Sequence, residues 1–474
     1  MACKEKISML IDGKKELYER ASDSIWDYAE TRFEEYRSAE LLCKILREEG
    51  FEVTTGLAGM QTAFVGSFGS GEPVIGILGE FDALFDLSQV AGITEKKPLV
   101  PGGSGHGCGH NALGVGALAA AVAVKDYRKE HQLSGTVRYY GCPAEEVGSG
   151  KAFMAREGVF DDLDAALSWH PGDMNEVWGC SSLAVTQAYF KFSGISSHAA
   201  AAPQLGRSAL DAVELMNVGA NYLREHVIPE ARIHYAITNA GGLSPNVVQA
   251  NAEVLYVVRA PKFRQAKEIF DRVVKIANGA ALMTGTDFET VIDSGYTDYI
   301  PNDTLSRLMS EKMKELGPWQ ADGEEIGFAK EIGETLTATQ KATANARVRD
   351  REELGVIRET GIAGFVRPYQ KSDTPMPGST DVGDVSWIVP TAQCSAVTQA
   401  FGTPGHSWQV VSQGKSRICH KGMLLAAKTI ALTAAELFEH PEIVSRAREE
   451  WKETLHGESY LCPIPPEVKP AALR

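Results

Sequence analysis

The sequence predicts an α/β protein whose main sheet is interrupted by a smaller, separate βαββαβ domain. Two observations carry this prediction. Strand-like and helix-like segments alternate from about residue 63 to residue 140, which is typical of a sheet covered by helices. From Ala184 onward polar and apolar residues alternate instead, and the first pattern resumes only after Pro301.

The first part is predicted to contain helices, three strands and one long helix. Between residues 15 and 49 large apolar side chains recur at roughly helical spacing among charges, so we expect helices that pack on a sheet. Strands are predicted at Ala63–Phe68, Val74–Leu78 and Thr136–Tyr140. The alanine-rich stretch from about Leu113 to Arg128 predicts a long helix before the third strand.

The interrupting segment is predicted to hold six elements in the order βαββαβ. They are strand Ala184–Phe192, helix Ser208–His226, strands Ile233–Thr238 and Glu253–Val258, helix Phe263–Met283 and a strand near Phe288. This is the split βαβ arrangement. We therefore expect a catalytic domain in two parts, residues 1–182 and 298–474, and an inserted domain at residues 183–297. The polar stretch 317–372 has only weak periodicity, and its role is not predicted.

Composition excludes several functional classes. The chain has 474 residues and a net charge of -15 without any basic run, which argues against binding to a nucleic acid backbone. Its first 17 residues are charged throughout, and no stretch approaches the roughly 20 apolar residues of a membrane span, so we expect a cytoplasmic protein. The eight cysteines include no C-x-x-C pair, so a zinc ribbon or a redox dithiol is not indicated.

The most informative motif is the glycine-rich run from Gly105 to Asn111. It places Cys108 and His110 just before the predicted long helix, and both residue types bind zinc or manganese. Two divalent ions roughly 3.5–4 Å apart need a bridging anion, and a Cys108 thiolate could serve. His106 is a ligand, a hydrogen-bond donor to one, or merely a helix-entry residue, and we favour the last role.

Downstream residues supply the rest of a possible dinuclear site. Glu145 and Glu146 follow a predicted strand in a turn-like context, where one carboxylate can bind metal and its neighbour can transfer a proton. His170 ends an apolar strand pattern, and His406 lies in a loop rich in glycine and proline. His198 belongs to the inserted domain, so it needs domain closure or a second subunit to reach the metals.

Two glycine-rich segments resemble phosphate-binding motifs but do not match them. Gly150–Lys151 is followed by Ala152 instead of the Ser or Thr of a phosphate loop. The glycines at 103 and 105 lack the third glycine of a dinucleotide fingerprint, since that position holds Cys108.

Taken together, the segments resemble the dinuclear metallo-amidohydrolases of the carboxypeptidase G and aminoacylase type. The resemblance is carried by five segments, Glu30–Ser38, Gly79–Leu84, Gly107–Asn111, Pro143–Glu146 and Gly194–Ala199. It implies a metal-dependent exopeptidase-like catalytic domain with a lid and dimerisation domain inserted in it. Within the family, the chain is similar to the branch that acts on p-aminobenzoyl-glutamate, through Ser244–Gln249, Ser379–Trp387 and Gly402–His420.

The resemblance also implies residue roles. Cys108 would bridge two Mn²⁺ or Zn²⁺ ions, with Glu146 and His406 on one ion and His110 and His170 on the other. Glu145 would be the general base, Asp82 would orient a ligand, and His198 would stabilise the oxyanion across a dimer interface. Asn246 and Arg259 would line the substrate site. The two carboxylates of a glutamate product separately favour an arginine fork, for which Arg259 and Arg207 are candidates, with Trp408 as an aromatic wall. Glu80 and Asn111 depart from the family pattern, where relatives have a metal-binding histidine and an aspartate.

We therefore expect hydrolysis of an N-acyl amide of an amino acid, with p-aminobenzoyl-glutamate or a related folate fragment as the first candidate. A dipeptidase or aminoacylase with the same metal site is the nearest alternative. A non-catalytic partner of a homologous hydrolase is an alternative of another class. The expected assembly is a homodimer or a heterodimer with a homologous chain.

Overall fold

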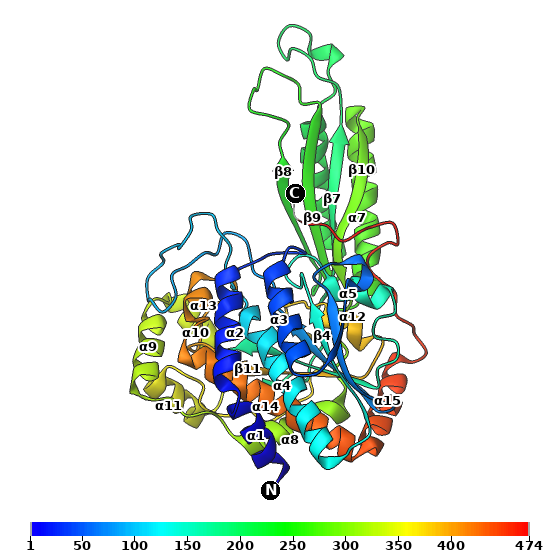
Figure 1. Cartoon of the computed structure of the whole chain (residues 1–474). Coiled ribbons are helices and arrows are strands. Elements are labelled where there is room, and N and C mark those ends of the chain that lie inside the picture. The colour runs from blue at the N-terminus through cyan, green and yellow to red at the C-terminus, as the bar shows by residue number, and fades with distance from the viewer. Residues whose placement is uncertain (1, 473–474) are drawn as a thin grey trace.

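The computed structural model describes residues 2–472, and its strands form two sheets. A seven-stranded sheet has the order β1-β2-β4-β3-β5-β11-β6, and a four-stranded sheet has the order β10-β7-β9-β8. The four-stranded sheet and its helices project from the rest of the molecule (Figure 1). We call this projection, residues 184–296, the inserted unit and the remainder the main body.

The larger sheet is mixed, and its centre is parallel. Its strands are β1 (Glu52–Thr55), β2 (Phe64–Ser70), β3 (Val74–Glu80), β4 (Gly135–Cys142), β5 (Ala165–Gly172), β6 (Glu176–Val177) and β11 (Thr391–Val397). Strands β4, β3, β5 and β11 pair in parallel, whereas β1, β2 and β6 add antiparallel pairs at the edges. The three strands predicted in the first part are thus confirmed as β2, β3 and β4.

Apolar side chains on both faces of this sheet are buried under helices. Ile75, Ile77 and Tyr139 face one core, while Leu78 and Tyr140 face the other. This is the period-2 alternation of a strand that is covered on both sides. The helices of the main body around the two faces are α1 (Cys3–Asp12), α2 (Lys15–Tyr28), α3 (Tyr36–Glu48), α4 (His110–His131), α5 (Gly150–Arg156), α8 (Asp303–Leu316), α12 (Val382–Ser386), α13 (Trp408–Gln413), α14 (Arg417–Glu439) and α15 (Pro441–Leu455).

Helix α4 is the centre of the larger core and fixes the start of the functional site. The alanine-rich helix is buried along nearly all its length, against α14 on one side and the sheet on the other. A Cβ at Gly114 would lie 2.6 Å from the carbonyl oxygen of Glu80, so glycine lets α4 approach the end of β3. The helix therefore begins, at His110, directly beside the carboxyl end of that strand.

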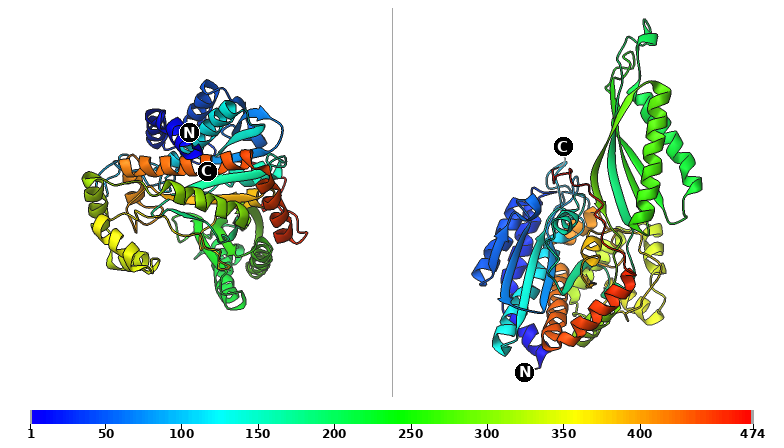
Figure 2. Two further views of the ribbon diagram at one scale, coloured as in Figure 1. Left: turned by 90° about the horizontal axis from the view of Figure 1, so that it is seen from below. Right: turned by 90° about the vertical axis from the view of Figure 1, so that its right-hand side faces the viewer.

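The inserted unit has the predicted order βαββαβ. Its elements are β7 (Ala184–Ser193), α6 (Ala209–Leu223), β8 (Arg232–Asn239), β9 (Asn251–Ala260), α7 (Phe263–Thr284) and β10 (Asp287–Tyr296), with short 3₁₀ turns η2 (Pro203–Leu205) and η3 (Arg224–His226). Both helices lie on the same face of the sheet (Figure 2). The strand β8 lies at one edge and is mostly exposed.

The stretch 317–372 forms three helices with a small core of their own. They are α9 (Gly323–Glu334), α10 (Ala338–Ala346) and α11 (Arg351–Thr360), and η1 (Leu57–Gly59) is the remaining 3₁₀ turn of the main body. Ile332, Ala344 and Ile357 pack there against Phe401, which belongs to the loop before His406. Among the described residues, none of the helices has both the length and the apolar character that a bilayer span requires.

Candidate metal centre

The predicted site residues converge at the carboxyl end of the parallel strands. Asp82 follows β3, Glu145 and Glu146 follow β4, and His170 lies near the end of β5. Cys108 and His110 come from the start of α4, which reaches the same edge. Open parallel sheets commonly bind ligands at this edge, because the loops after neighbouring strands meet there.

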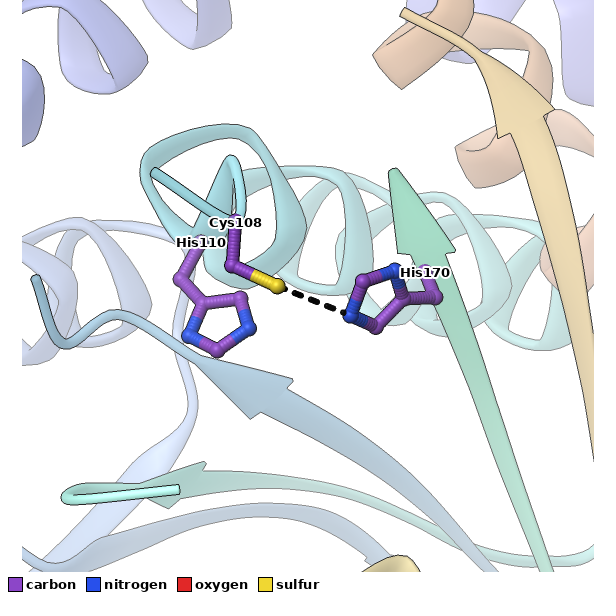
Figure 3. A group of neighbouring side chains, drawn as sticks. All are labelled: Cys108, His110 and His170. Atoms are coloured by element: carbon purple, nitrogen blue, oxygen red, sulfur yellow. Dashed lines mark hydrogen bonds between the residues drawn. The ribbon is translucent and has the colours of Figure 1, made fainter. Parts of the chain in front are cut away.

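Cys108, His110 and His170 form one compact group. The Sγ atom of Cys108 lies 3.4 Å from Nε2 of His170 (Figure 3). The imidazole rings of His110 and His170 meet edge-on, with their centroids 5.8 Å apart. Gly109 between Cys108 and His110 has φ 78°, a left-handed conformation that glycine adopts without strain, and a Cβ there would lie 2.9 Å from Pro171. This glycine therefore allows both side chains to point at His170.

Asp82 holds two residues of the site in place. Its Oδ1 accepts a hydrogen bond from Nδ1 of His110 at 2.9 Å, and its Oδ2 accepts one from the backbone amide of Glu146 at 2.9 Å. A carboxylate on Nδ1 fixes the tautomer, so the lone pair of Nε2 of His110 faces the interior of the site. This geometry supports the expected role of Asp82 in orienting a metal ligand.

A second group joins Cys108 with Glu146 and His406. His406 Nε2 lies 3.2 Å from Oε2 of Glu146, and the backbone amide of His406 donates to the carbonyl of Gly107. His406 has φ 52°, which is unusual for a residue with a side chain and signals a conformation maintained by its surroundings. Its side chain is 58% exposed, whereas that of Glu146 is 4% exposed.

Glu145 lies in a turn with an unusual backbone. We call residues 144–149 the Glu145 turn; Ala144 and Ser149 at its two ends have φ 57° and 60°. Oxygen atoms of Glu145 and Glu80 lie within 4.8 Å of each other and of a His110 nitrogen. Burial, followed by the charges of Glu80 and Glu146, raises the pKa of Glu145 well above its usual value.

The protonation of the cluster suits metal binding. Burial opposes a thiolate at Cys108, but His170 and His110 more than offset it and lower the pKa of the thiol well below its usual value. Burial and the nearby Cys108 raise the pKa of Glu146 to about 7, and hydrogen bonds to Cys108 and Glu146 raise that of His406 to about 11. These shifts describe a set of anions and imidazoles that share protons.

The residues present fit a pair of divalent cations. Cys108 is common to two groups whose nitrogen, sulfur and oxygen atoms lie within 4.8 Å of one another, one with His110 and His170 and the other with Glu146 and His406. Within them, buried Nε2 of His110 and Oε1 of Glu146 have no hydrogen-bond partner. Donor atoms 3.2–3.4 Å apart are close enough to hold one divalent cation such as Zn²⁺ in common.

A buried lysine beside the cluster was not predicted. Lys151, fully buried, lies 2.7 Å from Oε1 of Glu80 and 2.5 Å from Oδ1 of Asp381. In the sequence this residue stands out only as part of a segment that does not match a phosphate loop. The available signal was its position, a lone charge beside the apolar Ala152–Ala155 run of α5, since a lysine buried among apolar residues requires anionic partners.

Two residues of the glycine-rich run hydrogen-bond to other segments of the main body and not to the metal-site residues. Nε2 of His106 hydrogen-bonds the carbonyl of Ile25 at 2.9 Å, and burial lowers its pKa to about 4. Nδ2 of Asn111 donates to Ser22 Oγ and to the carbonyl of Gly414. Asn111 thereby ties the start of α4 to two neighbouring segments.

The predicted residues of the inserted unit lie apart from the cluster. His198 lies between β7 and α6 and Asn246 between β8 and β9, and Nδ1 of His198 accepts hydrogen bonds from the amides of Ala200 and Ala201. These two connections lie at the end of the unit that points away from the main body (Figure 1). Arg259 lies at the other end, near the main body, and donates to Ser379 Oγ at 3.3 Å. Arg207 is exposed near the tip, whereas Trp408 lines a cavity of about 260 Å³ next to His406.

Comparisons with known proteins show similarity to one peptidase family. Residues 76–436 match the model of peptidase family M20/M25/M40. The chain is 50% identical to the B subunit of p-aminobenzoyl-glutamate hydrolase from Escherichia coli (strain K12), over 98% of each chain. It is 28% identical to the Xaa-Arg dipeptidase of Mus musculus, over 97% of this chain and 94% of that one.

Solved structures share the fold. A putative aminohydrolase from methicillin resistant Staphylococcus aureus has a TM-score of 0.64 at 18% identity, covering 91% of this chain and 99% of that one. A dinuclear metal binding peptidase of the M20 family from Bacillus subtilis has a TM-score of 0.55 at 17% identity, covering 90% and 99%. At such identities the likeness concerns the fold alone.

Proposed function

Since the chain belongs to peptidase family M20/M25/M40 and is a metallo-amidohydrolase, we propose that it hydrolyses p-aminobenzoyl-glutamate to p-aminobenzoate and glutamate. The substrate assignment is carried by one observation, the 50% identity along 98% of both chains to the B subunit of the E. coli hydrolase. The clustered donors around Cys108 support the metal-dependent chemistry.

We assign the metal ligands to the two groups that share Cys108. Glu146 and His406 would hold one ion with it, and His110 and His170 the other. Divalent cations bound there polarise the scissile carbonyl and make water more acidic. Mn²⁺ or Zn²⁺ is the proposed metal, because thiolate, imidazole and carboxylate together suit such cations.

Glu145 is the proposed general base. Its buried carboxylate takes a proton from the attacking water, whose oxygen forms a bond to the carbonyl carbon. The same proton then passes to the amide nitrogen as the C–N bond breaks, which releases the free acid and the amine of glutamate. An oxygen of the Glu145 carboxylate lies within 4.8 Å of a nitrogen of His110, one of the proposed ligands.

The inserted unit is proposed to act as lid and dimerisation domain, with boundaries at residues 183 and 297. His198, which lies outside the cluster of its own chain, would stabilise the oxyanion in the site of a partner chain. Asn246 and Arg259 would bind the substrate. The partner is a second copy or a homologous chain, since the E. coli hydrolase also has an A subunit, which is 27% identical to this chain over 58% of this chain and 73% of that one.

The test is release of p-aminobenzoate by the purified chain with Mn²⁺ or Zn²⁺, comparing wild type with Glu145→Gln. Loss of a general base costs about 10²- to 10⁴-fold in kcat, while bound metal should remain. Glu157→Gln is the matched control, because Glu157 is exposed at the end of α5 and pairs only with Arg156. Full turnover by Glu145→Gln would show that another group is the base.

A dipeptidase is the second candidate, favoured by the similarity to the mouse Xaa-Arg dipeptidase along 97% of this chain. A panel of aminobenzoyl, dipeptide and N-acetyl amino-acid substrates separates the two. Turnover of dipeptides alone would replace the proposed substrate and leave the metal chemistry intact. A purified chain that binds no metal would instead indicate a non-catalytic partner of a homologous hydrolase.

A further inference from the structure

The end of the inserted unit is in direct contact with the Glu145 turn. The hydroxyl of Tyr296, the last residue of β10, donates to the carbonyl of Glu145 at 2.8 Å. One residue earlier, the amide of Gly295 donates to Ser149 Oγ at 3.1 Å. Both ends of the turn that carries the proposed base therefore touch the strand by which the inserted unit rejoins the main body.

Arg32 makes a third connection between these two segments. Its Nη1 donates to the carbonyl of Val147, inside the turn, at 2.8 Å. Nη1 and Nη2 also donate hydrogen bonds to Oδ2 and Oδ1 of Asp293 on β10, each at 3.0 Å. Nε donates to the carbonyl of Ala471 at 2.9 Å, so the guanidinium, with a side chain only 4% exposed, contacts three separate segments.

A β-bulge directs Asp293 toward Arg32. The pairing of β10 with β7 shifts register between Ile292 and Ser294, which leaves Asp293 as the extra residue. Bulges of this kind re-aim a side chain, often next to active sites. Gln187 on β7 donates to Oδ2 of Asp293 at 2.7 Å and fixes the carboxylate in this direction.

From these contacts we propose that Arg32 is a positioning residue, which couples the placement of the inserted unit to the shape of the Glu145 turn. Arginine is required because its planar fork binds both oxygens of Asp293 while a further N–H reaches Val147, and the single ammonium of lysine cannot reproduce this. A buried ion pair adds little net stability compared with apolar packing, so its use here is to set a geometry.

Arg32 thus acts through Val147 and not on the substrate. A displacement of β10 relative to the main body moves Asp293 and, through Arg32, the carbonyl of Val147, which follows Glu146 directly. The catalytic consequence rests on the proposed function, whereas the mechanical coupling does not. The two parts are therefore measured separately.

The coupling is tested by hydrogen–deuterium exchange on the full chain without substrate. Arg32→Lys and Asp293→Asn should each raise exchange in peptides covering residues 141–150 and 287–296 together, at least several-fold. Arg37→Lys is the matched control, because Arg37 lies in the same segment but is exposed and stacks on Tyr28, and it should leave both peptides unchanged. Asp293→Asn keeps the shape of the site and tests the coupling if Arg32→Lys folds poorly.

The catalytic part is tested with p-aminobenzoyl-glutamate. Arg32→Lys should lower kcat about tenfold, the equivalent of one charge-assisted hydrogen bond, with KM and bound metal unchanged. Unchanged exchange in the turn peptide of both variants would overturn the proposal. So would wild-type kcat in Arg32→Lys, whereas a wild type inactive on this substrate refutes only the proposed function and leaves the exchange result to decide on Arg32.

Discussion

Gly150 is the position where one methyl group should disturb the Glu145 turn most. A Cβ added there would lie 1.9 Å from the carbonyl oxygen of Pro143, and such contacts are essentially never shorter than 3.0 Å. In Gly150→Ala the start of α5 and the residue before the turn must therefore separate by at least about 1.1 Å. Because a misplacement of about 1 Å can cost roughly 100-fold in rate, we expect kcat to fall about 100-fold.

The assay is steady-state hydrolysis together with circular dichroism and metal content. Gly327→Ala is the control, since Gly327 lies within α9 and a Cβ there meets nothing within 4 Å. That variant should keep its activity, and replacing a helical glycine with alanine adds about 0.5–1 kcal/mol of stability. A folded Gly150→Ala protein with wild-type kcat would refute the argument that the close packing of α5 against Pro143 sets the turn.

Two further predictions concern stability. Burial raises the pKa of Asp384 from 3.8 to about 8, so the contribution of its protonated form to stability is complete below about pH 4 and is lost as the pH rises through 8. Relative to Asp384→Asn, the wild type should lose a few kcal/mol of unfolding free energy between these two pH values, measured by urea denaturation at each. If the wild type and the variant differ in stability by the same amount at both pH values, the prediction is wrong. When metal is added back to protein stripped with a chelator, a free metal concentration of about 100 times Kd should raise the free energy of unfolding by about 2.7 kcal/mol, measured by thermal unfolding. Cys108→Ser should abolish that gain and Cys3→Ser, at the start of α1, should not, so a gain retained in Cys108→Ser would exclude the shared-ligand role.

Local patterns predicted much of the fold because they report burial directly. The strands β2, β3 and β4 and the βαββαβ order follow from short apolar runs and from period-2 alternation. Helix α1, by contrast, was not predicted, and α4 begins at His110, three residues before the predicted start. The helices α9–α11 were not resolved into elements, since α10 spans only nine residues and pairs a weak apolar stripe with many small side chains.

The donors of the site could be named from the sequence because each is a metal-binding residue type beside a glycine or a strand end. Among the residues that support these donors, the family resemblance implied Asp82, whereas Lys151 and Arg32 were not predicted. Lys151 meets Glu80 and Asp381, and Arg32 meets Asp293, across separations in the chain that only the folded topology closes. The direction of Asp293 depends on a bulge, and no local sequence signal marked it.

The two ends of the inserted unit leave the main body at one point. Val185, near the start of β7, pairs directly with Tyr296, at the end of β10, and partners in an antiparallel pair lie only about 5 Å apart. A gap of this width can be closed by a very short peptide, so the inserted unit interrupts the main body at a single place. The whole unit could therefore be exchanged between homologous chains at this one place, and the order of the main-body strands around the loop that carries Cys108 would stay the same.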